Sequence, residues 1–305
     1  MLQIFTNEQD DRNMSGMQHG SWVHLAAPTE DEIGYVCRQH RIPVDFIRDA
    51  LDKGERARFE LCGELSLIII QAPLQMTAED RVLYRTVPIG IIRTKEAMIT
   101  VCRVNHPIFA EAIENRGGSA AMYSYFGWIQ AVARHYSKSV DELDWKIVAA
   151  ETELRRSIHN KDVYTLLNIN KSLVFFTKSL KSNQAALHKL MRAFGTEMAE
   201  RDEKLMQYAL IEMQQAYDTA YIHNTNLSNL MDAYAAVIEN NVSNELKSLT
   251  AVAFLLTIPL VIATMYGMNI PLPYQDEGAA LTVLMSGSVV LSAITAWIFH
   301  KKRLF

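Results

Sequence analysis

The chain has 305 residues, with 30 Lys and Arg against 34 Asp and Glu, and its net charge of −4 excludes a generally cationic nucleic-acid-binding protein. Residues 248–305 hold only five charged side chains, so almost all of the charge lies in the first 247 residues. The chain therefore divides into a polar part and an apolar C-terminal part. Its cysteines, Cys37, Cys62 and Cys102, have no metal-binding spacing, which favours reduced thiols over a disulfide framework or a structural zinc site.

Short β-rich runs alternate with helical ones in residues 1–118, which predicts a cytosolic α/β domain with a sheet. The predicted strands are residues 22–25, 64–71, 87–92 and 98–103. A helix is predicted over 28–40, because Thr29 and Glu32 have the spacing of a capping box. His24, His106 and His223 are predicted to be hydrogen-bonded structural residues, and Trp22, Trp128 and Trp145 to lie in the cytosolic core.

The pattern is helical from residue 119 onwards, and 119–195 is predicted to be a set of cytosolic helices. Three helices are expected, near 120–136, 138–160 and 161–194, with Ser139 and Asn160 as caps. Between Gly195 and Pro259 there is neither Gly nor Pro, so 196–258 can form one helix, roughly 95 Å long at 1.5 Å per residue. Its part before the membrane, 196–247, is called the stalk.

Two uncharged runs predict a pair of membrane-spanning helices, at 248–267 and 278–300. A short extracytoplasmic loop, 268–277, joins them and carries acids but no base, whereas Lys247 precedes the first span and a basic tail, 301–305, follows the second. By the positive-inside rule both termini are cytosolic. Because the N-terminus also lacks a signal-peptide pattern, we expect a multi-pass protein of the cell membrane.

A mildly polar stripe follows the first span at heptad spacing. It consists of Ser243, Thr250, Thr257 and Thr264, flanked by Leu246, Ala253, Leu260 and Gly267. Such a stripe fits either tight helix packing, in which the hydroxyls bond back to the backbone, or the wall of a water-filled conduit.

Acidic and hydroxyl side chains continue the Leu246 line down the stalk. They are Glu239, Asp232, Thr225 and Asp218. Residues 205–246 contain five acids and no Lys or Arg, so several copies around one axis would form a negative funnel that concentrates cations. A solvated acidic face is the alternative interpretation.

The first span ends at Tyr266-Gly267-Met268-Asn269, and Pro271 and Pro273 prevent its continuation. Gly267 suits a helix C-cap that exposes carbonyl groups, and Asn269 adds an amide oxygen. Converging helix ends of this kind favour a cation. Since Mg²⁺ releases its waters reluctantly, such oxygens can bind the hydrated ion through hydrogen bonds to those waters.

This segment, placed directly after the first of two C-terminal spans, resembles the signature of the CorA family of magnesium channels and transporters. Further similarities lie at Lys247, Leu249-Thr250, Pro259, 271–273, Lys301-Lys302-Arg303, Asn240-Asn241 and 170–183. The resemblance implies a homopentamer, with an α/β/α cytosolic funnel joined by the stalk to a two-helix transmembrane hairpin. The first spans would line one axial pore and the second spans would form an outer ring.

The resemblance also implies roles for individual residues. Gly267, Met268 and Asn269 would form the selectivity filter, with Gly267 and Asn269 binding the metal in its outer sphere. The hydrophobic constriction would correspond to Leu246 and Leu249. Where the family often has an Asn at the cytosolic pore mouth, this chain has Ser243 with Asn244 beside it, so either residue could form that polar ring. Acidic side chains that could sense cytosolic Mg²⁺ between subunits are Asp202, Glu203, Glu212 and Asp218.

These features together predict passive influx of hydrated Mg²⁺, which both permeates and regulates, without an organic cofactor or a nucleic-acid partner. Another divalent cation, Co²⁺, Ni²⁺ or Zn²⁺, is the alternative cargo, although the spans lack the thiolate and imidazole ligands of a soft-metal site. A membrane-anchored enzyme is disfavoured because no HExxH, GxSxG or P-loop pattern occurs. A membrane-anchored sensor or scaffold without flux remains the third possibility.

Overall fold

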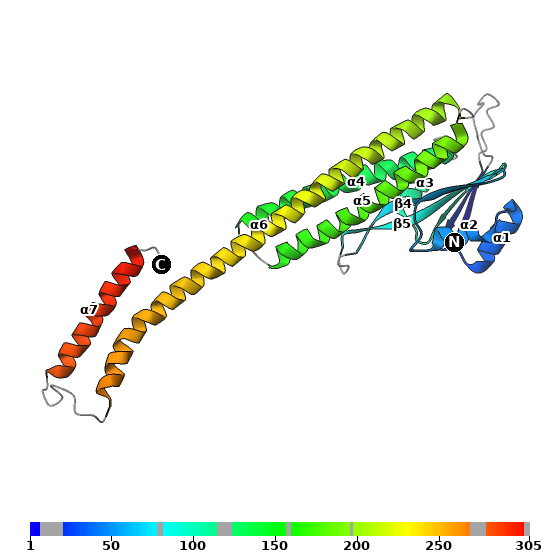
Figure 1. The fold of residues 1–305 in the computed structure, drawn as a ribbon. Coiled ribbons are helices and arrows are strands. Elements are labelled where there is room, and N and C mark those ends of the chain that lie inside the picture. The colour runs from blue at the N-terminus through cyan, green and yellow to red at the C-terminus, as the bar shows by residue number, and fades with distance from the viewer. Residues whose placement is uncertain are drawn as a thin grey trace. The chain divides into compact units, whose positions relative to one another are not determined.

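The structure is a computed structural model of the chain, and it describes residues 1–6, 21–77, 82–114, 124–156, 160–195, 198–268 and 279–301. The chain forms two compact units, Met1–Asn229 and Leu230–Phe305, here called the first and the second unit. The first unit contains a sheet covered by helices (Figure 1), and the second contains the apolar helices.

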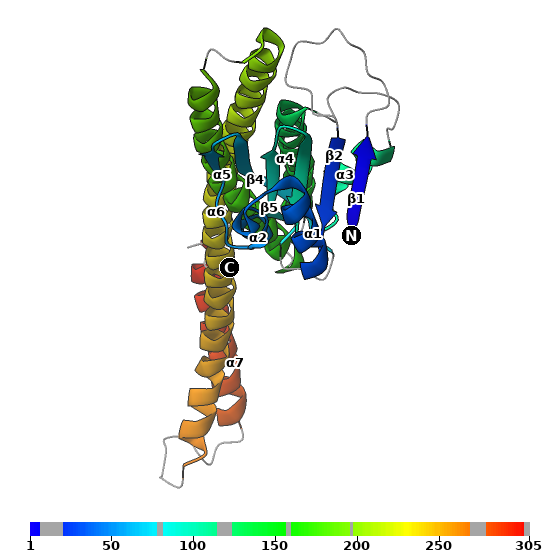
Figure 2. The ribbon, with the colours of Figure 1, turned by 90° about the vertical axis from the view of Figure 1, so that its right-hand side faces the viewer.

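Six strands form one mixed sheet in the first unit (Figure 2). They are β1 (Leu2–Thr6), β2 (Ser21–Ala26), β3 (Arg58–Cys62), β4 (Leu65–Gln75), β5 (Tyr84–Arg93) and β6 (Ala97–Cys102). The order is β1-β2-β6-β5-β4-β3, with β2 parallel to β6 and every other pair antiparallel. The four predicted strands are confirmed as β2, β4, β5 and β6. The two missed strands, β1 and β3, are the edge strands.

Helices cover both faces of the sheet, giving three layers, α/β/α. On one face, α1 (Glu30–His40) and α2 (Val44–Leu51) bury Ile33 and Ile47 against Val23, Leu25 and their neighbours on the sheet. On the other face lie α4 (Tyr125–Arg156) and α5 (Asn160–Phe194), with α3 (Pro107–Glu114) beside α4. Alternation along β2 produces this division, since successive side chains point to opposite faces.

The predicted capping box at the start of α1 is confirmed. The Glu32 amide donates to Thr29 Oγ1 over 3.3 Å, and the Thr29 amide donates to Glu32 Oε2 over 2.9 Å. The eight-residue helices α2 and α3 were not predicted. The N-cap position of α2 is Pro43, which makes no side-chain capping bond and so gives no sequence signal.

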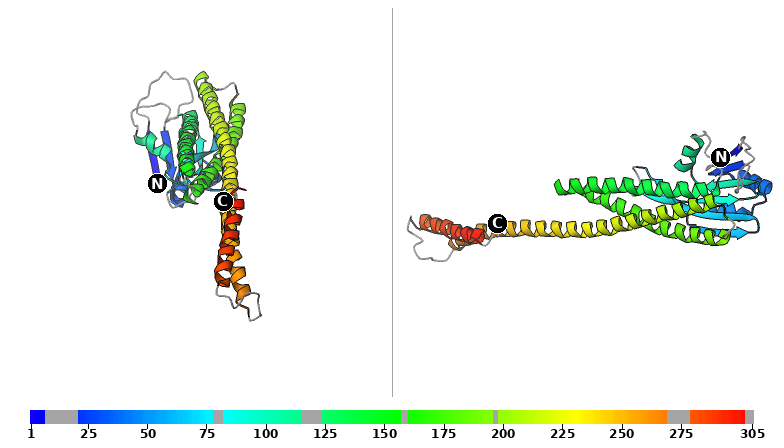
Figure 3. Two further views of the ribbon diagram at one scale, coloured as in Figure 1. Left: turned by 90° about the vertical axis from the view of Figure 1, so that its left-hand side faces the viewer. Right: turned by 90° about the horizontal axis from the view of Figure 1, so that it is seen from above.

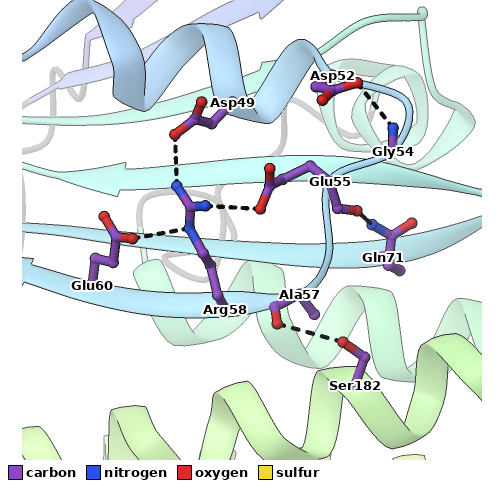
Figure 4. Close-up of polar contacts among 9 residues, drawn as sticks. All are labelled: Asp49, Asp52, Gly54, Glu55, Ala57, Arg58, Glu60, Gln71 and Ser182. Carbon is purple, nitrogen blue, oxygen red and sulfur yellow. Dashed lines mark hydrogen bonds and ion pairs between the residues drawn. The ribbon is translucent and has the colours of Figure 1, made fainter.

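An arginine on the edge strand β3 ties that strand to α2 (Figure 4). Arg58 makes ion pairs of 2.6 Å to Asp49, 2.8 Å to Glu55 and 3.0 Å to Glu60. The Gln71 side-chain amide of β4 donates to the Glu55 carbonyl over 2.7 Å. These contacts hold the edge strand where strand pairing is available on one side only.

Two predictions for α4 are wrong. The expected boundary near residue 137 does not exist, because α4 is continuous and the Ser139 hydroxyl donates to the His135 carbonyl of the preceding turn (2.8 Å) instead of capping a new helix. Trp145 is 77% exposed, whereas Trp22 and Trp128 are buried with their ring centroids 4.9 Å apart. Trp145 lies two residues after the buried Leu143, which turns its side chain to the opposite face of the helix.

The buried histidines have the structural role predicted for them. His24 Nδ1 lies 2.9 Å from Thr100 Oγ1, and His106 Nε2 lies 2.9 Å from the Pro73 carbonyl. His223 Nε2 lies 3.4 Å from Asp144 Oδ1.

The predicted long helix is present as α6 (Glu200–Tyr266), which has 67 residues and contains Pro259 (Figures 1 and 3). The last helix is α7 (Ala280–Lys301). Both α6 and α7 contain a stretch long and apolar enough to cross a membrane, and only 6% of each stretch is buried in the single chain. That exposure is unlike the core helix of a soluble domain, which would be mostly buried.

Candidate functional site

One face of α6 in the second unit packs against α7. Ala251 is 4% exposed and Leu255, Ile258 and Ile262 are partly buried, which marks a face repeating every three or four residues. On α7, Ser288 is buried. Small side chains at such contacts let two helix backbones approach closely.

A proline inside α6 is accommodated by this contact. Pro259 has no N–H, so the carbonyl of Leu255, four residues earlier, loses its normal helical partner. The Ser292 hydroxyl of α7 donates to that Leu255 carbonyl over 3.4 Å. In an apolar environment an unpaired carbonyl is costly, and a neighbouring hydroxyl is one of the groups that can pair with it. Sequence reasoning missed this role of Ser292, although a hydroxyl on one apolar run and a proline on the other were visible signals.

The predicted pore stripe lies on the opposite face of α6. At 100° per residue its positions centre roughly half a turn away from Ala251 and Leu255. Seven of the eight stripe residues are exposed in the single chain and Ser243 is half-exposed. The exposed ones are Leu246, Leu249, Thr250, Ala253, Thr257, Leu260 and Thr264.

Each threonine of the stripe donates its hydroxyl proton to its own helix. Thr250 Oγ1 bonds to the Leu246 carbonyl (2.7 Å), Thr257 Oγ1 to Ala253 (2.8 Å) and Thr264 Oγ1 to Val261 (2.9 Å). Because a hydroxyl has one proton and two lone pairs, the side of each oxygen turned away from the helix is an acceptor. The back-bonding is compatible with both interpretations of the stripe, close packing and a water-filled wall.

The helix ends at the predicted filter segment. The Gly267 amide bonds to the Ala263 and Thr264 carbonyls (3.0 and 3.2 Å), and the Met268 amide to the Met265 carbonyl (3.4 Å). Gly267 and Met268 are exposed. Asn269 and the predicted loop beyond it, through residue 278, lie outside the described residues.

The acidic line on the stalk is exposed. Asp218, Asp232 and Glu239 are all on the surface, with Asp218 Oδ1 accepting a bond of 2.9 Å from the Gln214 side chain. The buried face of α6 in the first unit carries Met206, Met213 and alanines instead. The acids are therefore available to solvent or to another copy of the chain.

The four acidic residues considered for metal sensing differ in environment. Asp202 is partly buried, and this burial raises the pKa of its carboxyl group despite the nearby charges of Arg201 and Arg93. Glu203 Oε1 accepts a bond of 3.2 Å from Gln207. Glu212 lines a groove of about 640 Å³ between α4 and α6. Among the described residues, no three His, Cys, Asp or Glu side chains gather closely enough to hold a metal ion.

The segment 170–183, singled out in the sequence, has a structural role in α5. Ser172 Oγ accepts the amide protons of Leu83 and Tyr84 (3.1 and 3.0 Å), and Asn183 bonds to both backbone groups of Gln71 (2.8 Å each). These contacts dock α5 on β4 and β5 rather than contributing to an ion pathway.

Comparison with known proteins identifies relatives over nearly the whole chain. The family model described as "CorA-like Mg2+ transporter protein" matches residues 17–302. A cobalt/magnesium transport protein CorA from Methanocaldococcus jannaschii is 24% identical over 292 residues, covering 92% of this chain and 90% of that protein. A protein of the same description from Thermotoga maritima is 22% identical over 267 residues, covering 84% and 75%.

Solved structures share the fold. The complete structure of the CorA magnesium transporter from Methanocaldococcus jannaschii matches with a TM-score of 0.78 at 22% identity, covering 92% of this chain and 90% of that one. The full-length CmaX protein matches with a TM-score of 0.69 at 12% identity, covering 97% and 92%.

Proposed function

The chain belongs to the CorA family of Mg²⁺ transporters, and from that membership we propose that it carries hydrated Mg²⁺ into the cytosol through an axial pore formed by five copies. The observation that carries the proposal is the threonine stripe of α6. It is exposed in the single chain, lies opposite the α7 face, and leads to Gly267 at the end of the helix.

The proposed arrangement places α6 around the axis and α7 outside it, as two antiparallel spans. Each α6 uses one face for its own α7, which leaves the threonine face for the axis. The outward acceptor side of each Thr hydroxyl suits the water protons of a hydrated cation, since water bound to Mg²⁺ donates hydrogen bonds. A divalent ion entering a negatively charged cytosol gains about 4.6 kcal/mol per 100 mV, which makes a passive mechanism sufficient.

Selectivity is assigned to the segment that ends the first span, Gly267, Met268 and Asn269. Carbonyl and amide oxygens there would accept hydrogen bonds from the ion's waters without removing them. Leu246 and Leu249 would form the apolar constriction near the cytosolic mouth. Ser243 or Asn244 would supply the polar ring beside it.

Regulation by cytosolic Mg²⁺ is assigned to contacts between copies. Because the described residues of one chain hold no metal-binding group of three, such a site needs carboxylates from two chains. Glu203, Glu212 and Asp218 present theirs near the surface of α6, and the partly buried Asp202 would adjust the local charge. Loss of the ion would leave like charges repelling across the interface and loosen the assembly.

Both termini are placed in the cytosol and the spans in the cell membrane. Lys247 precedes the first span and basic residues follow the second, whereas the connecting loop carries Asp276 and Glu277. Co²⁺ is the second candidate cargo, because both curated relatives are named cobalt/magnesium transport proteins.

The test is ion uptake into liposomes that contain the purified full-length protein and an internal Mg²⁺ dye, with the membrane potential set by a K⁺ gradient. We expect saturable, voltage-dependent uptake that is lost in Asn269→Ala and kept in Asn226→Ala, an exposed stalk residue off the acidic line. Native mass spectrometry of each variant reports whether it still assembles. Failure of assembled wild-type protein to take up Mg²⁺ or Co²⁺ would refute transport and leave a membrane-anchored sensor or scaffold.

A further inference from the structure

The second unit carries a groove of about 540 Å³ between α6 and the end of α7. It is lined by Glu239, Val242, Ser243, Leu246, Lys247, Thr250, Ala251, Phe254 and Phe299. The groove crosses the start of the uncharged run at Ser248, so its wall changes character along α6. Its two ends therefore offer different chemistry to an occupant.

One end of the groove is apolar and the other is polar. Val242 is 49% exposed and Phe254 61% exposed, although both are large apolar residues. Phe254 lies beyond Ser248 at the membrane level, together with Thr250 and Ala251, while the charged residues of the groove lie before Ser248. An apolar channel that meets charge at the membrane boundary matches the build of a phospholipid, with acyl chain and head group in that order.

The charge at that boundary favours an anion. Lys247 is exposed, and within the described part of the chain its only polar contact is the Asn244 amide oxygen, 3.5 Å away. Two residues beyond Phe299, the Lys301 ammonium lies 5.2 Å from the centre of the Trp297 ring, a position typical of the membrane interface. The sequence continues with Lys302 and Arg303.

A carboxylate at the lower end fixes where the phosphate can lie. Glu239 precedes Lys247 by eight residues, roughly 12 Å along the helix, and would repel a phosphate beside it. An anionic head group is therefore restricted to the level of Lys247.

We infer that this groove binds an anionic phospholipid of the cytosolic leaflet, with its phosphate at Lys247 and an acyl chain along Val242, Leu246, Phe254 and Phe299. The inference rests on the proposed function only in placing the second unit in a membrane. Because Leu246 and Thr250 belong both to this groove and to the pore stripe, a lipid bound here contacts the residues that would line the cytosolic mouth.

The experiment uses full-length protein in nanodiscs of phosphatidylcholine with one fifth phosphatidylglycerol. A photo-reactive benzoylphenylalanine replaces Phe254, and adducts are identified by mass. We expect phosphatidylglycerol adducts above their share of the bilayer. Lys247→Gln should lower this enrichment about five-fold, as expected for one basic residue at an anionic surface. Lys204→Gln, which removes an equally exposed charge paired with Glu200 in the first unit, should not change it.

Three results would overturn the inference. They are an adduct with a second copy of the chain, adducts in proportion to bilayer composition, or enrichment that Lys247→Gln leaves unchanged. Mg²⁺ uptake measured in parallel separates this question from transport. Uptake without lipid enrichment refutes the groove alone, whereas enrichment without uptake refutes transport and leaves the groove.

Discussion

The most closely determined prediction concerns Asn183, which is fully buried on α5 and faces β4. Its side-chain oxygen accepts the Gln71 amide proton and its side-chain nitrogen donates to the Gln71 carbonyl, both at 2.8 Å. The pairing of β4 with β3 ends at Ile69, two residues before Gln71. Asn183 therefore takes the place of a strand partner for one residue of the sheet.

Replacing Asn183 by Ala would leave both backbone groups of Gln71 buried without a partner. Each such group costs about 1–3 kcal/mol, so the first unit should lose about 2–5 kcal/mol. For a unit of this size 1 kcal/mol corresponds to about 2–4 °C, which predicts a fall of roughly 5–15 °C in the unfolding temperature. The neighbouring Ser182 is the matched control, because its hydroxyl makes one partly buried bond of 3.4 Å to the Ala57 carbonyl (Figure 4).

The assay is thermal unfolding of the full-length protein, followed by the fluorescence of Trp22 and Trp128, which are buried in the same unit. Ser182→Ala should change the midpoint by about 2 °C or less, since a weak, partly exposed bond contributes under 1 kcal/mol. An Asn183→Ala midpoint within that same margin would refute the reasoning, because it would mean that Gln71 finds other partners at no cost.

Two further predictions concern the first unit. Burial lowers the pKa of both His24 and His106 to about 4, so the unfolded chain binds protons first and stability should fall as pH drops from 6.5 towards 4, by on the order of 3 kcal/mol per histidine; urea unfolding at pH 7.5 and 5 measures this, and equal midpoints would contradict it. Gly90→Ala would place a methyl group 2.5 Å from Ala50 Cβ and should destabilise by about 1–3 kcal/mol, whereas Gly34→Ala in α1, with open space around it, should be neutral or stabilising; equal thermal midpoints for the two variants would show that α2 moves aside freely.

His106 shows why that pH dependence has a structural origin. The Pro73 carbonyl needs a proton on Nε2, while the Ile108 amide donates to Nδ1 over 3.3 Å. A proton on Nδ1 would break the second bond, which lies at the start of α3. Protonation is thus opposed by hydrogen bonding as well as by burial, and acid should loosen α3 before the central strands.

Strong local patterns made much of the first unit predictable. The apolar runs of β4, β5 and β6 lie in the centre of the sheet, and the capping box of α1 forms as expected. The strands missed, β1 and β3, are edge strands with fewer buried residues and five residues each. Short exposed strands lack the continuous apolar run that the prediction needed.

The errors in α4 came from reading single residues without their tertiary context. Ser139 has the spacing of a cap, but a buried serine within a helix can bond back to its own backbone, as it does here. Trp145 was assigned to the core by residue type, although the spacing of Leu143, Ala150 and Leu154 places it on the other face. The helical period was the better guide in both cases.

The second unit is where sequence pattern and structure provide different parts of the argument. A span that is apolar on all sides does not show which face meets another helix, because lipid and helix are equally apolar partners. The threonine heptad singled out one face, and the structure shows that α7 contacts the other one. Pro259 explains why α7 contacts that face: it frees the Leu255 carbonyl, and Ser292 pairs with it. A proline that would end a helix in water thus fixes, in this chain, which side of α6 is left for the axis of the proposed pore.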